Sequence, residues 1–411
     1  MRTSPLWSQW RLPLPTHALQ SRMMRARRGS SRASMSVSAE TRGDKHHAGT
    51  GEKSLPKRET GAFQKLPMVM PSIDILSSAK RKARNVTPTK GIANIAKRER
   101  NKAAKHLDAL MKELAVPLRE YKENFPKKQF LHPYERALIE LTFGEGKYEQ
   151  VLGRVDSLRK KVLFVGKQHA SLCAQSQTKR EAEERLNEGL KKVEEVFQLE
   201  RKAVEDLIYV AKMLRAMPVV DPETPTLCLV GAPNVGKSSL VRILSTGKPE
   251  VCNYPFTTRG ILMGHIVINY ERFQVTDTPG LLTRHDDDRN NLERLTLAVL
   301  THLPTAVLYV HDLTGECGTS PADQFITYKE IKERFLGHLW VDVVSKCDLL
   351  QDPLSSFTAD DLERYKNLGP DGAIRVSVKS EVGISELKDK VHDLLLSQMA
   401  RVKGEEIKRA C

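Results

Sequence analysis

The feature that most restricts the fold is the run Gly231-Ala-Pro-Asn-Val-Gly-Lys-Ser238, which has the spacing G-x-x-x-x-G-K-S. The apolar segment Leu227–Val230 precedes it and predicts a buried strand, and Ser239–Leu244 follows with a helical pattern. The glycines let backbone amides approach a phosphate group closely, and the N-terminus of a helix adds partial positive charge. The run therefore predicts a phosphate-binding loop between a strand and a helix.

The second half of the chain, expected as one domain over 223–398, alternates short apolar runs with helical patterns. The apolar runs lie at 227–230, 266–268, 273–275, 306–310, 339–344 and 373–376. Such alternation predicts an α/β domain with a mostly parallel sheet. A short basic tail is expected over 399–411.

Four further motifs follow in this half, each expected at the C-terminal end of a strand. They are Pro255-Phe-Thr-Thr258, Asp277-Thr-Pro-Gly280, Ser345-Lys-Cys-Asp348 and Ser377-Val-Lys379. Because loops at the carboxyl ends of parallel strands gather at one edge of the sheet, the five motifs together predict a nucleotide site.

Five residues are expected around the phosphates. Lys237 reaches the β- and γ-phosphates, and Ser238 is a ligand of Mg²⁺. The Thr258 hydroxyl completes the magnesium shell only when a γ-phosphate is present, so its loop is expected to act as a switch. Asp277 holds the metal through water, and the amide of Gly280 senses the γ-phosphate.

The last two motifs predict that the base is guanine. Asp348 can accept two hydrogen bonds from the Watson–Crick edge of guanine, and the Lys346 stem can lie along the base. We therefore expect GTP and GDP, and the P-loop kinase or ATPase alternative is disfavoured. The residues expected to contact nucleotide are Asn234, Val235, Gly236, Lys237, Ser238, Ser239, Phe256, Thr257, Thr258, Asp277, Gly280, Ser345, Lys346, Asp348, Ser377, Val378 and Lys379.

Hydrolysis is expected to be slow. Leu281 stands where Ras-like enzymes place the glutamine that orients the attacking water. Asn234 is either a K⁺ ligand that stimulates hydrolysis or a loop-stabilising residue. The expected catalytic residues are Asn234, Lys237, Thr258 and Gly280. His285 is interpreted as a solvated loop residue, with a catalytic base as the alternative.

The region 75–218 is helical by pattern and predicts a helical bundle. One long helix is expected from Thr178 to Met217, where Pro218 ends it. Others are expected over Ala93–Leu118, from His132-Pro133 to Gly144, and through Val151–Val165. The first of these is rich in Lys and Arg, which is either a solvated face or a contact for an RNA backbone.

The first 39 residues contain no Asp or Glu but seven Arg and eight Ser. This composition is typical of an organelle transit peptide, with a basic nucleic-acid-binding arm as the alternative. Residues 40–74 are polar and predict a linker. The chain carries a net charge of +15, which favours a polyanionic partner such as RNA. No transmembrane span is expected, and the six scattered cysteines predict free thiols.

The motifs resemble those of the TRAFAC-class GTPases, within them the Obg-related branch, and more specifically the nucleolar GTP-binding (Nog-type) family. His132-Pro133-Tyr134, Asp221-Pro222 and Asp288-Arg289-Asn290 carry the closer resemblance. So do Ala306–Val310 with Asp312-Leu313 and Cys317-Gly318, and the similarity covers about 75–398.

The resemblance implies a role in assembly of the large ribosomal subunit, with the helical domain set against ribosomal RNA. Ser345 departs from the Asn of the family. The transit-like start and the early end of the chain suggest an organellar member, in the chloroplast or alternatively the mitochondrion. We expect a monomer when free and no DNA partner. The alternative function is a GTP-binding scaffold with negligible turnover.

Overall fold

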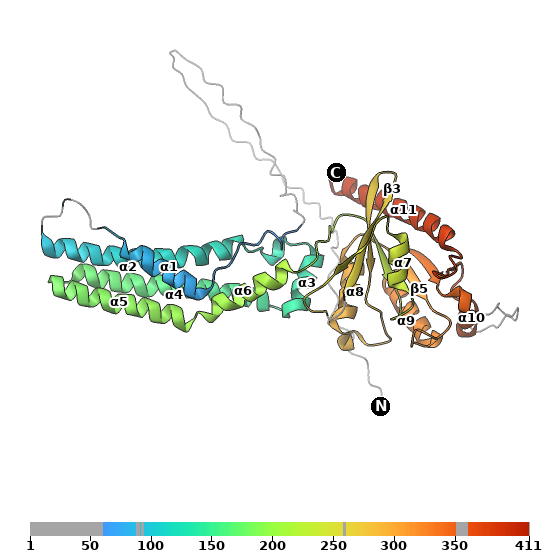
Figure 1. Cartoon of the computed structure of the whole chain (residues 1–411), viewed down its shortest axis with the longest axis horizontal. Coiled ribbons are helices and arrows are strands. Elements are labelled where there is room, and N and C mark those ends of the chain that lie inside the picture. The colour runs from blue at the N-terminus through green and yellow to red at the C-terminus, as the bar shows by residue number, and fades with distance from the viewer. Residues whose placement is uncertain (1–60, 88–90, 92–93, 258–259, 351–360, 411) are drawn as a thin grey trace, which may run out of the picture. The chain divides into compact units, whose positions relative to one another are not determined.

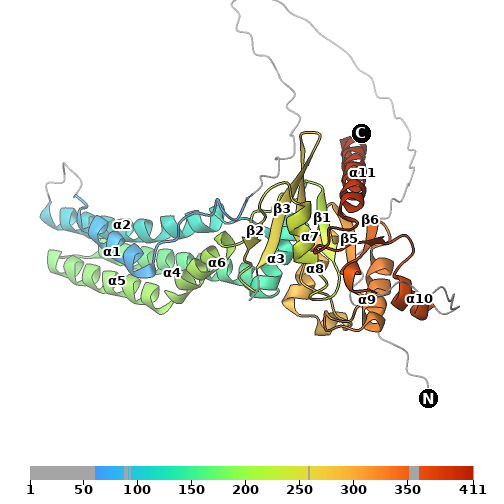
Figure 2. The same ribbon diagram turned by 45° about the vertical axis from the view of Figure 1, so that its right-hand side comes forward.

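The computed structural model describes residues 61–87, 91, 94–257, 260–350 and 361–410 of the chain. The N-terminal part is helical, and Figures 1 and 2 both show α1, α2, α4 and α5 lying side by side. Its helices are α1 (Ser72–Arg84), α2 (Ile95–Asn124), α3 (Pro133–Phe143), α4 (Lys147–Gln175), α5 (Lys179–Leu199) and α6 (Lys202–Arg215), with a 3₁₀ turn, η1, at Lys128–Phe130. This confirms the helical bundle.

Local signals explain where these helices begin and end. The side chain of Asn94 accepts a hydrogen bond from the Lys97 amide at 3.0 Å and caps α2. His132 and Glu135 form a capping box at the start of α3, with Pro133 in its first turn. Gly144, at φ 85°, ends that helix as its sequence predicted.

The single helix expected from Thr178 to Met217 is wrong. The chain forms two helices, α5 and α6, which are separated at Glu200 and Arg201. Leu199, at the end of α5, is 82% exposed and does not belong to the buried apolar stripe. Phe197 and Val204 are both buried and seven residues apart, and this spacing also fits a continuous helix. Hydrophobic periodicity therefore could not reveal the break.

The linker expected over 40–74 is corrected at its C-terminal end. Phe63, Leu66 and Val69 are buried in the same core cluster as the helices, and α1 begins at Ser72. The Ser72 hydroxyl donates to Glu205 of α6 at 2.6 Å. The helical domain thus begins at least ten residues before position 75, because these apolar side chains fill the bundle. Residues 40–60 lie outside the described part of the chain.

The C-terminal part is an α/β domain with one seven-stranded sheet in the order β2-β3-β4-β1-β5-β6-β7. Its strands are β1 (Thr226–Val230), β2 (Glu250–Cys252), β3 (Ile261–Ile268), β4 (Glu271–Asp277), β5 (Thr305–His311), β6 (Leu339–Val344) and β7 (Ile374–Arg375). β1 lies parallel between β4 and β5, with Leu227 opposite Val275 and Ala306. β3 is antiparallel to its neighbours β2 and β4, whereas the other pairs are parallel, so the sheet is mostly parallel, as predicted.

Helices cover both faces of this sheet. They are α7 (Lys237–Leu244), α8 (Asn291–His302), α9 (Pro321–Arg334), α10 (Asp361–Leu368) and α11 (Ile384–Ala410), with 3₁₀ turns η2 (Asp286–Asp288) and η3 (Cys347–Leu349). Cys228 and Val230 of β1 share a core with α8 and α9, whereas Leu227 and Leu229 share one with α7 and α11. The alternation along β1 therefore faces two buried layers.

Two further outcomes concern the C-terminal region and the cysteines. The tail expected over 399–411 is instead the last part of α11 as far as Ala410, because the helix continues past its buried Leu394 and Leu395. The five cysteines among the described residues are free thiols. Within those residues no helix is both long and apolar enough to cross a membrane.

Candidate nucleotide-binding site

The phosphate loop lies between β1 and α7, as its sequence predicted. Gly231 has φ 145°, and a Cβ atom there would lie 2.3 Å from the carbonyl oxygen of Val310, so β5 excludes a side chain. Lys237 is buried and donates to the carbonyl oxygens of Gly231 at 3.1 Å and Ala232 at 2.6 Å. Burial lowers the pKa of Lys237 to about 8. The ammonium group is thus held inside the loop, where phosphates are expected.

A cavity of about 530 Å³ opens beside this loop. Its size is within the usual range for a small-molecule site. It is lined by Pro233, Asn234, Gly236, Lys237, Ser238, Ser239, Gly260, Ile261, Asp277, Thr278, Pro279, Gly280, Leu282, Asn290, Leu292 and Glu293. Seven of the predicted nucleotide contacts therefore share one cavity, which extends toward α8.

The expected magnesium corner is assembled from two elements. The Ser238 hydroxyl, at the start of α7, donates a hydrogen bond to Asp277 Oδ2 at the end of β4. Asp277 Oδ1 is buried and has no hydrogen-bond partner among the described residues. Burial raises the pKa of Asp277. A buried carboxylate oxygen beside a hydroxyl fits a hard cation such as Mg²⁺. Thr258, the third expected ligand, lies outside the described residues.

The segment after Asp277 is packed tightly against the phosphate loop. A Cβ atom on Gly280 would lie 2.3 Å from the backbone nitrogen of Pro233, so only glycine fits. The Leu281 amide donates to the Gly231 carbonyl at 3.1 Å, and its side chain is fully buried. A leucine side chain has no polar group that could orient a water molecule, and slow hydrolysis stays a prediction.

Helix α8 holds this segment from the other side. Glu293 is buried and accepts hydrogen bonds from the amides of Leu282 at 3.2 Å and Asn290 at 3.1 Å. Thr296 donates to the carbonyl of Pro279 at 3.2 Å. The sequence interpretation missed Glu293. Its signal was the pairing of Asn290 with a glutamate three residues later, the pattern of a capping box.

The base side of the site is formed where β6 and β7 end. The amide of Cys347 donates to the Val376 carbonyl at 3.1 Å, which places the two predicted base motifs side by side. Asp348 lies in η3 and is exposed, as is Lys379, whereas Ser377 is buried. Ser345, Lys346, Asp348, Ser377, Val378, Lys379, Val235, Phe256 and Thr257 do not line the 530 Å³ cavity.

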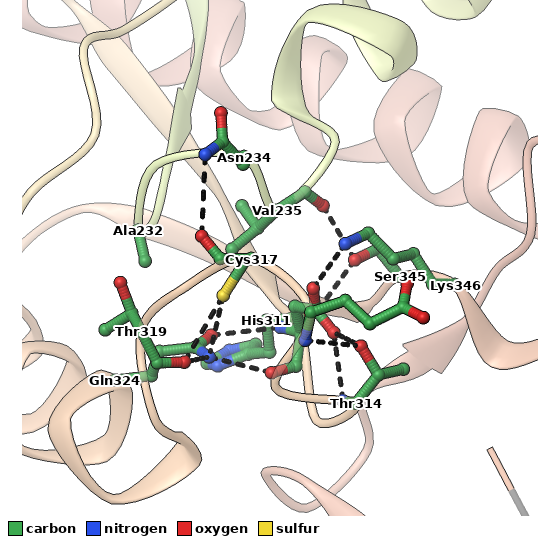
Figure 3. A network of polar contacts seen from close by, with 12 residues as sticks. Ala232, Asn234, Val235, His311, Thr314, Cys317, Thr319, Gln324, Ser345 and Lys346 are labelled. Carbon is green, nitrogen blue, oxygen red and sulfur yellow. Dashed lines mark hydrogen bonds and ion pairs between the residues drawn. The ribbon is translucent and has the colours of Figure 1, made fainter. Parts of the chain in front are cut away.

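Ser345 is buried between the phosphate loop and β5 (Figure 3). Its hydroxyl lies 2.7 Å from the carbonyl oxygen of Val235 and 2.9 Å from that of His311, and it can donate to one of them at a time. This serine ties the two segments together although it is shorter than asparagine. Lys346 follows at φ 55° and contacts Asp312, a residue with no role in the sequence-based site.

Tyr254 directly precedes the predicted switch motif Pro255–Thr258 and is buried against the helical domain. Its hydroxyl oxygen lies 2.9 Å from that of Tyr134 in α3. Thr257 donates from its hydroxyl to the Tyr254 carbonyl at 3.0 Å, and Phe256 packs on the Tyr254 ring with centroids 5.7 Å apart. Phe256 and Thr257 thus shape a turn. Tyr134 was noticed in the sequence only as part of a family resemblance.

The fold and the site define a P-loop GTPase domain preceded by a helical domain. The family described as "NOG1 N-terminal helical domain" matches residues 63–221, and the one described as "50S ribosome-binding GTPase" matches residues 226–340. The two matched domains thus follow one another in this chain, which agrees with the resemblance to the nucleolar GTP-binding (Nog-type) family that its motifs indicate.

Proteins named nucleolar GTP-binding protein 1 are similar to this chain over most of its length. The one from Arabidopsis thaliana is 27% identical over 68% of this chain and 43% of its own length. The one from Drosophila melanogaster is 28% identical over 82% of this chain and 52% of its own length. The one from Encephalitozoon cuniculi is 30% identical over 83% of this chain and 64% of its own length. The chain thus spans about half the length of these relatives.

Proposed function

We propose that this protein is a GTP-hydrolysing switch that acts in assembly of the large ribosomal subunit of an organelle. The names of the similar proteins and the description "50S ribosome-binding GTPase" support this proposal. The composition of the first 39 residues, which lie outside the described part of the chain, favours the chloroplast, with the mitochondrion as the alternative.

The observation that carries the proposal is that both nucleotide-sensing segments are connected to helix α3 of the helical domain, one through the adjacent Tyr254 and the other through α8. Tyr254, directly before the first switch motif, forms a hydrogen bond with Tyr134 of α3. Helix α8, which holds the segment after Asp277, also packs on α3, and Asn291 donates to the Leu141 carbonyl at 3.4 Å. A change at the γ-phosphate therefore has two physical routes into the helical domain.

Within the switch, the chain's own residues bind GTP and leave hydrolysis slow. Lys237 meets the phosphates, and Mg²⁺ held by Ser238 and Asp277 would neutralise charge on the phosphate oxygens. Leu281 supplies no group for the attacking water. The Asn234 amide nitrogen faces the carbonyl of Cys317 at 3.5 Å, and its oxygen points the opposite way in Figure 3. We propose that this oxygen binds K⁺ and that K⁺ accelerates hydrolysis.

The start of α2 is the proposed surface for ribosomal RNA. Lys97, Arg98, Lys102 and Lys105 are exposed along it. Burial lowers the pKa of the nearby His106, and the positive charges of Lys102 and Arg84 lower it further. Lys80 and Lys82 of α1 are paired with Glu194 and Glu113 at 2.8 and 2.7 Å, whereas on α2 Arg98 has a longer contact with Glu99 at 3.9 Å. The α2 cations are therefore the better candidates for phosphate contacts.

Single-turnover hydrolysis tests this function. GTP cleavage would be followed alone, with large-subunit particles of a bacterial-type ribosome, and with small-subunit particles as a control. We expect at least a tenfold acceleration, on the order of 1.4 kcal/mol, by the large particles only. Rates in KCl should exceed those in matched NaCl, and Asn234→Ala should remove the difference.

A GTP-binding scaffold with negligible turnover is the second candidate, and the buried Leu281 favours it. Normal GTP binding without hydrolysis in the presence of every particle would support the scaffold. RNA contact is tested separately by binding to large-subunit RNA at increasing salt. Charge reversal of Lys102 and Lys105 together should weaken binding and flatten its salt dependence, whereas reversal of Lys179 and Arg180, exposed on α5, should not.

A further inference from the structure

Asp312 and Lys346 form an ion pair at the base side of the nucleotide site. Figure 3 shows Lys346 next to Ser345. Lys346 Nζ lies 2.6 Å from Asp312 Oδ2. The Lys346 side chain is 27% exposed, whereas that of Asp312 is fully buried. The pair therefore joins a buried carboxylate to a lysine at the surface of the site, and the lysine stem between them is available to a base.

The carboxylate of Asp312 has little freedom to move. Its Oδ1 accepts hydrogen bonds from the amide of Thr314 at 2.9 Å and from the Thr314 hydroxyl at 2.5 Å. The Gln324 side chain holds the backbone of Asp312 on both sides, accepting from its amide at 3.0 Å and donating to its carbonyl at 2.7 Å. With Oδ1 occupied in this way, Oδ2 faces Lys346 in a fixed position.

The same loop also reaches the phosphate side. Gln324 Nε2 lies 3.0 Å from the carbonyl of Thr319 and 3.4 Å from Cys317 Sγ, and the Cys317 carbonyl faces Asn234 of the phosphate loop. Asp312 directly follows β5, next to β6, which carries Ser345 and Lys346 at its end. The loop after β5 therefore connects the base side of the site with the phosphate loop.

We propose that Asp312 is a positioning residue for guanine nucleotide, acting through Lys346. A free lysine has a flexible four-carbon stem, and ordering that stem when a base binds costs affinity. The buried carboxylate holds the far end of the stem before the nucleotide arrives, so the stem already lies along the expected base plane. Gln324 supports this by fixing Asp312. The inference rests on the proposed guanine nucleotide site, and not on hydrolysis or on a ribosomal partner.

The test is a double-mutant cycle on GDP affinity, measured with a fluorescent GDP. Asp312→Asn keeps an acceptor for Thr314 but removes the charge that attracts Lys346. Lys346→Met keeps the stem and removes the ammonium group. We expect each single change to raise the dissociation constant about tenfold, which is about 1.4 kcal/mol and the size of ordering one long side chain. The double change should also raise it about tenfold, because both act on one contact.

Lys332→Met is the matched control. Lys332 also pairs with a buried carboxylate, Asp342, at 3.2 Å in the same domain. Its loss should lower the melting temperature without changing GDP affinity. Gln324→Leu adds an independent variant and should weaken GDP binding in the same direction as Asp312→Asn. Melting temperatures of all variants show whether each one folds.

Two outcomes overturn the inference. Unchanged GDP affinity in folded Asp312→Asn would show that the pair only stabilises the fold. A roughly hundredfold loss in the double variant would show that the two residues act separately. If the full chain binds GDP with the expected pattern but ribosomal particles never stimulate it, the proposed switch function fails and the positioning role stands. If the unmutated chain binds no guanine nucleotide, both fail.

Discussion

The hydroxyl pair of Tyr134 and Tyr254 allows a sharp prediction about communication between the nucleotide and the helical domain. Both side chains are buried, with 2% and 3% of their surfaces exposed, and their oxygens lie 2.9 Å apart. Burial raises the pKa of both, so each hydroxyl stays neutral over the working pH range. The test changes Tyr134 and Tyr254 to Phe, singly and together.

The expected magnitude follows from the burial. A net hydrogen bond of this kind contributes about 1 kcal/mol, and a lone buried hydroxyl costs about 1–3 kcal/mol. Each single Phe variant should therefore lose about 1–2 kcal/mol of stability. The double variant should lose less than the sum, because neither hydroxyl remains buried without a partner. The coupling should thus be on the order of 1 kcal/mol.

The functional consequence depends on movement of the first switch. If Thr258 closes on Mg²⁺ and γ-phosphate, the preceding Tyr254 must shift, and the bond to Tyr134 is released. Variants without that bond then bind a non-hydrolysable GTP analogue more tightly relative to GDP, by about fivefold for about 1 kcal/mol. Titration of both nucleotides against all four proteins measures this ratio.

Two results would contradict this prediction. Equal ratios of GDP to GTP-analogue affinity in all four proteins would mean that the pair is unchanged between the two states. Additive stability losses in the cycle would mean that the two hydroxyls do not interact in solution. Tyr209→Phe is a suitable control, because Tyr209 lies in the same helical domain and is 55% exposed.

The remaining predictions concern the phosphate side of the site. Gly280→Ala should sharply reduce affinity for a GTP analogue, because the alanine Cβ would lie 2.6 Å from the Cα of Pro233. Titrations with the analogue and with GDP measure this effect, and unchanged affinities for both nucleotides would contradict it. Lys237 has a pKa near 8 in the free protein, and we expect the phosphates of a bound nucleotide to keep it fully charged. Calorimetry of nucleotide binding in several buffers should therefore detect uptake of roughly 0.7 proton at pH 8.5 and little at pH 6.5. Equal uptake at both pH values would exclude Lys237 as its source. Ser345→Ala should cost about 1–2 kcal/mol of stability and weaken GDP binding, since the Val235 carbonyl loses its buried donor; unchanged melting and GDP binding would show that the tie is dispensable.

Much of the α/β domain could be predicted because its signals are local. A strand, the glycine-rich loop and a helix follow one another within about twenty residues, and every motif except Pro255–Thr258 comes directly after an apolar run. Parallel strands then bring Lys237, Asp277 and Lys346 to one edge without further information. The helical domain was predictable in kind for the same reason, since apolar residues recur at helical spacing.

The errors arose where packing overrides local pattern. A continuous apolar stripe could not show that the chain breaks between α5 and α6. Phe63 and Val69 lie at the C-terminal end of the stretch that predicted a linker, and the bundle shows that they are core residues. In the sequence, Ser345 was a departure from the Asn of the family. In the structure its short side chain reaches the Val235 carbonyl, because the two segments lie close together.

The phosphate loop of this protein was determined by the sequence itself, because eight adjacent residues contain the amides, the lysine and the hydroxyl that it needs. What holds Lys346 and what the first switch contacts were decided by the tertiary structure alone. Asp312 is 34 residues from Lys346, and Tyr134 is 120 residues from Tyr254. No periodicity or spacing encodes such pairs, since contact between distant residues depends on how strands and helices pack.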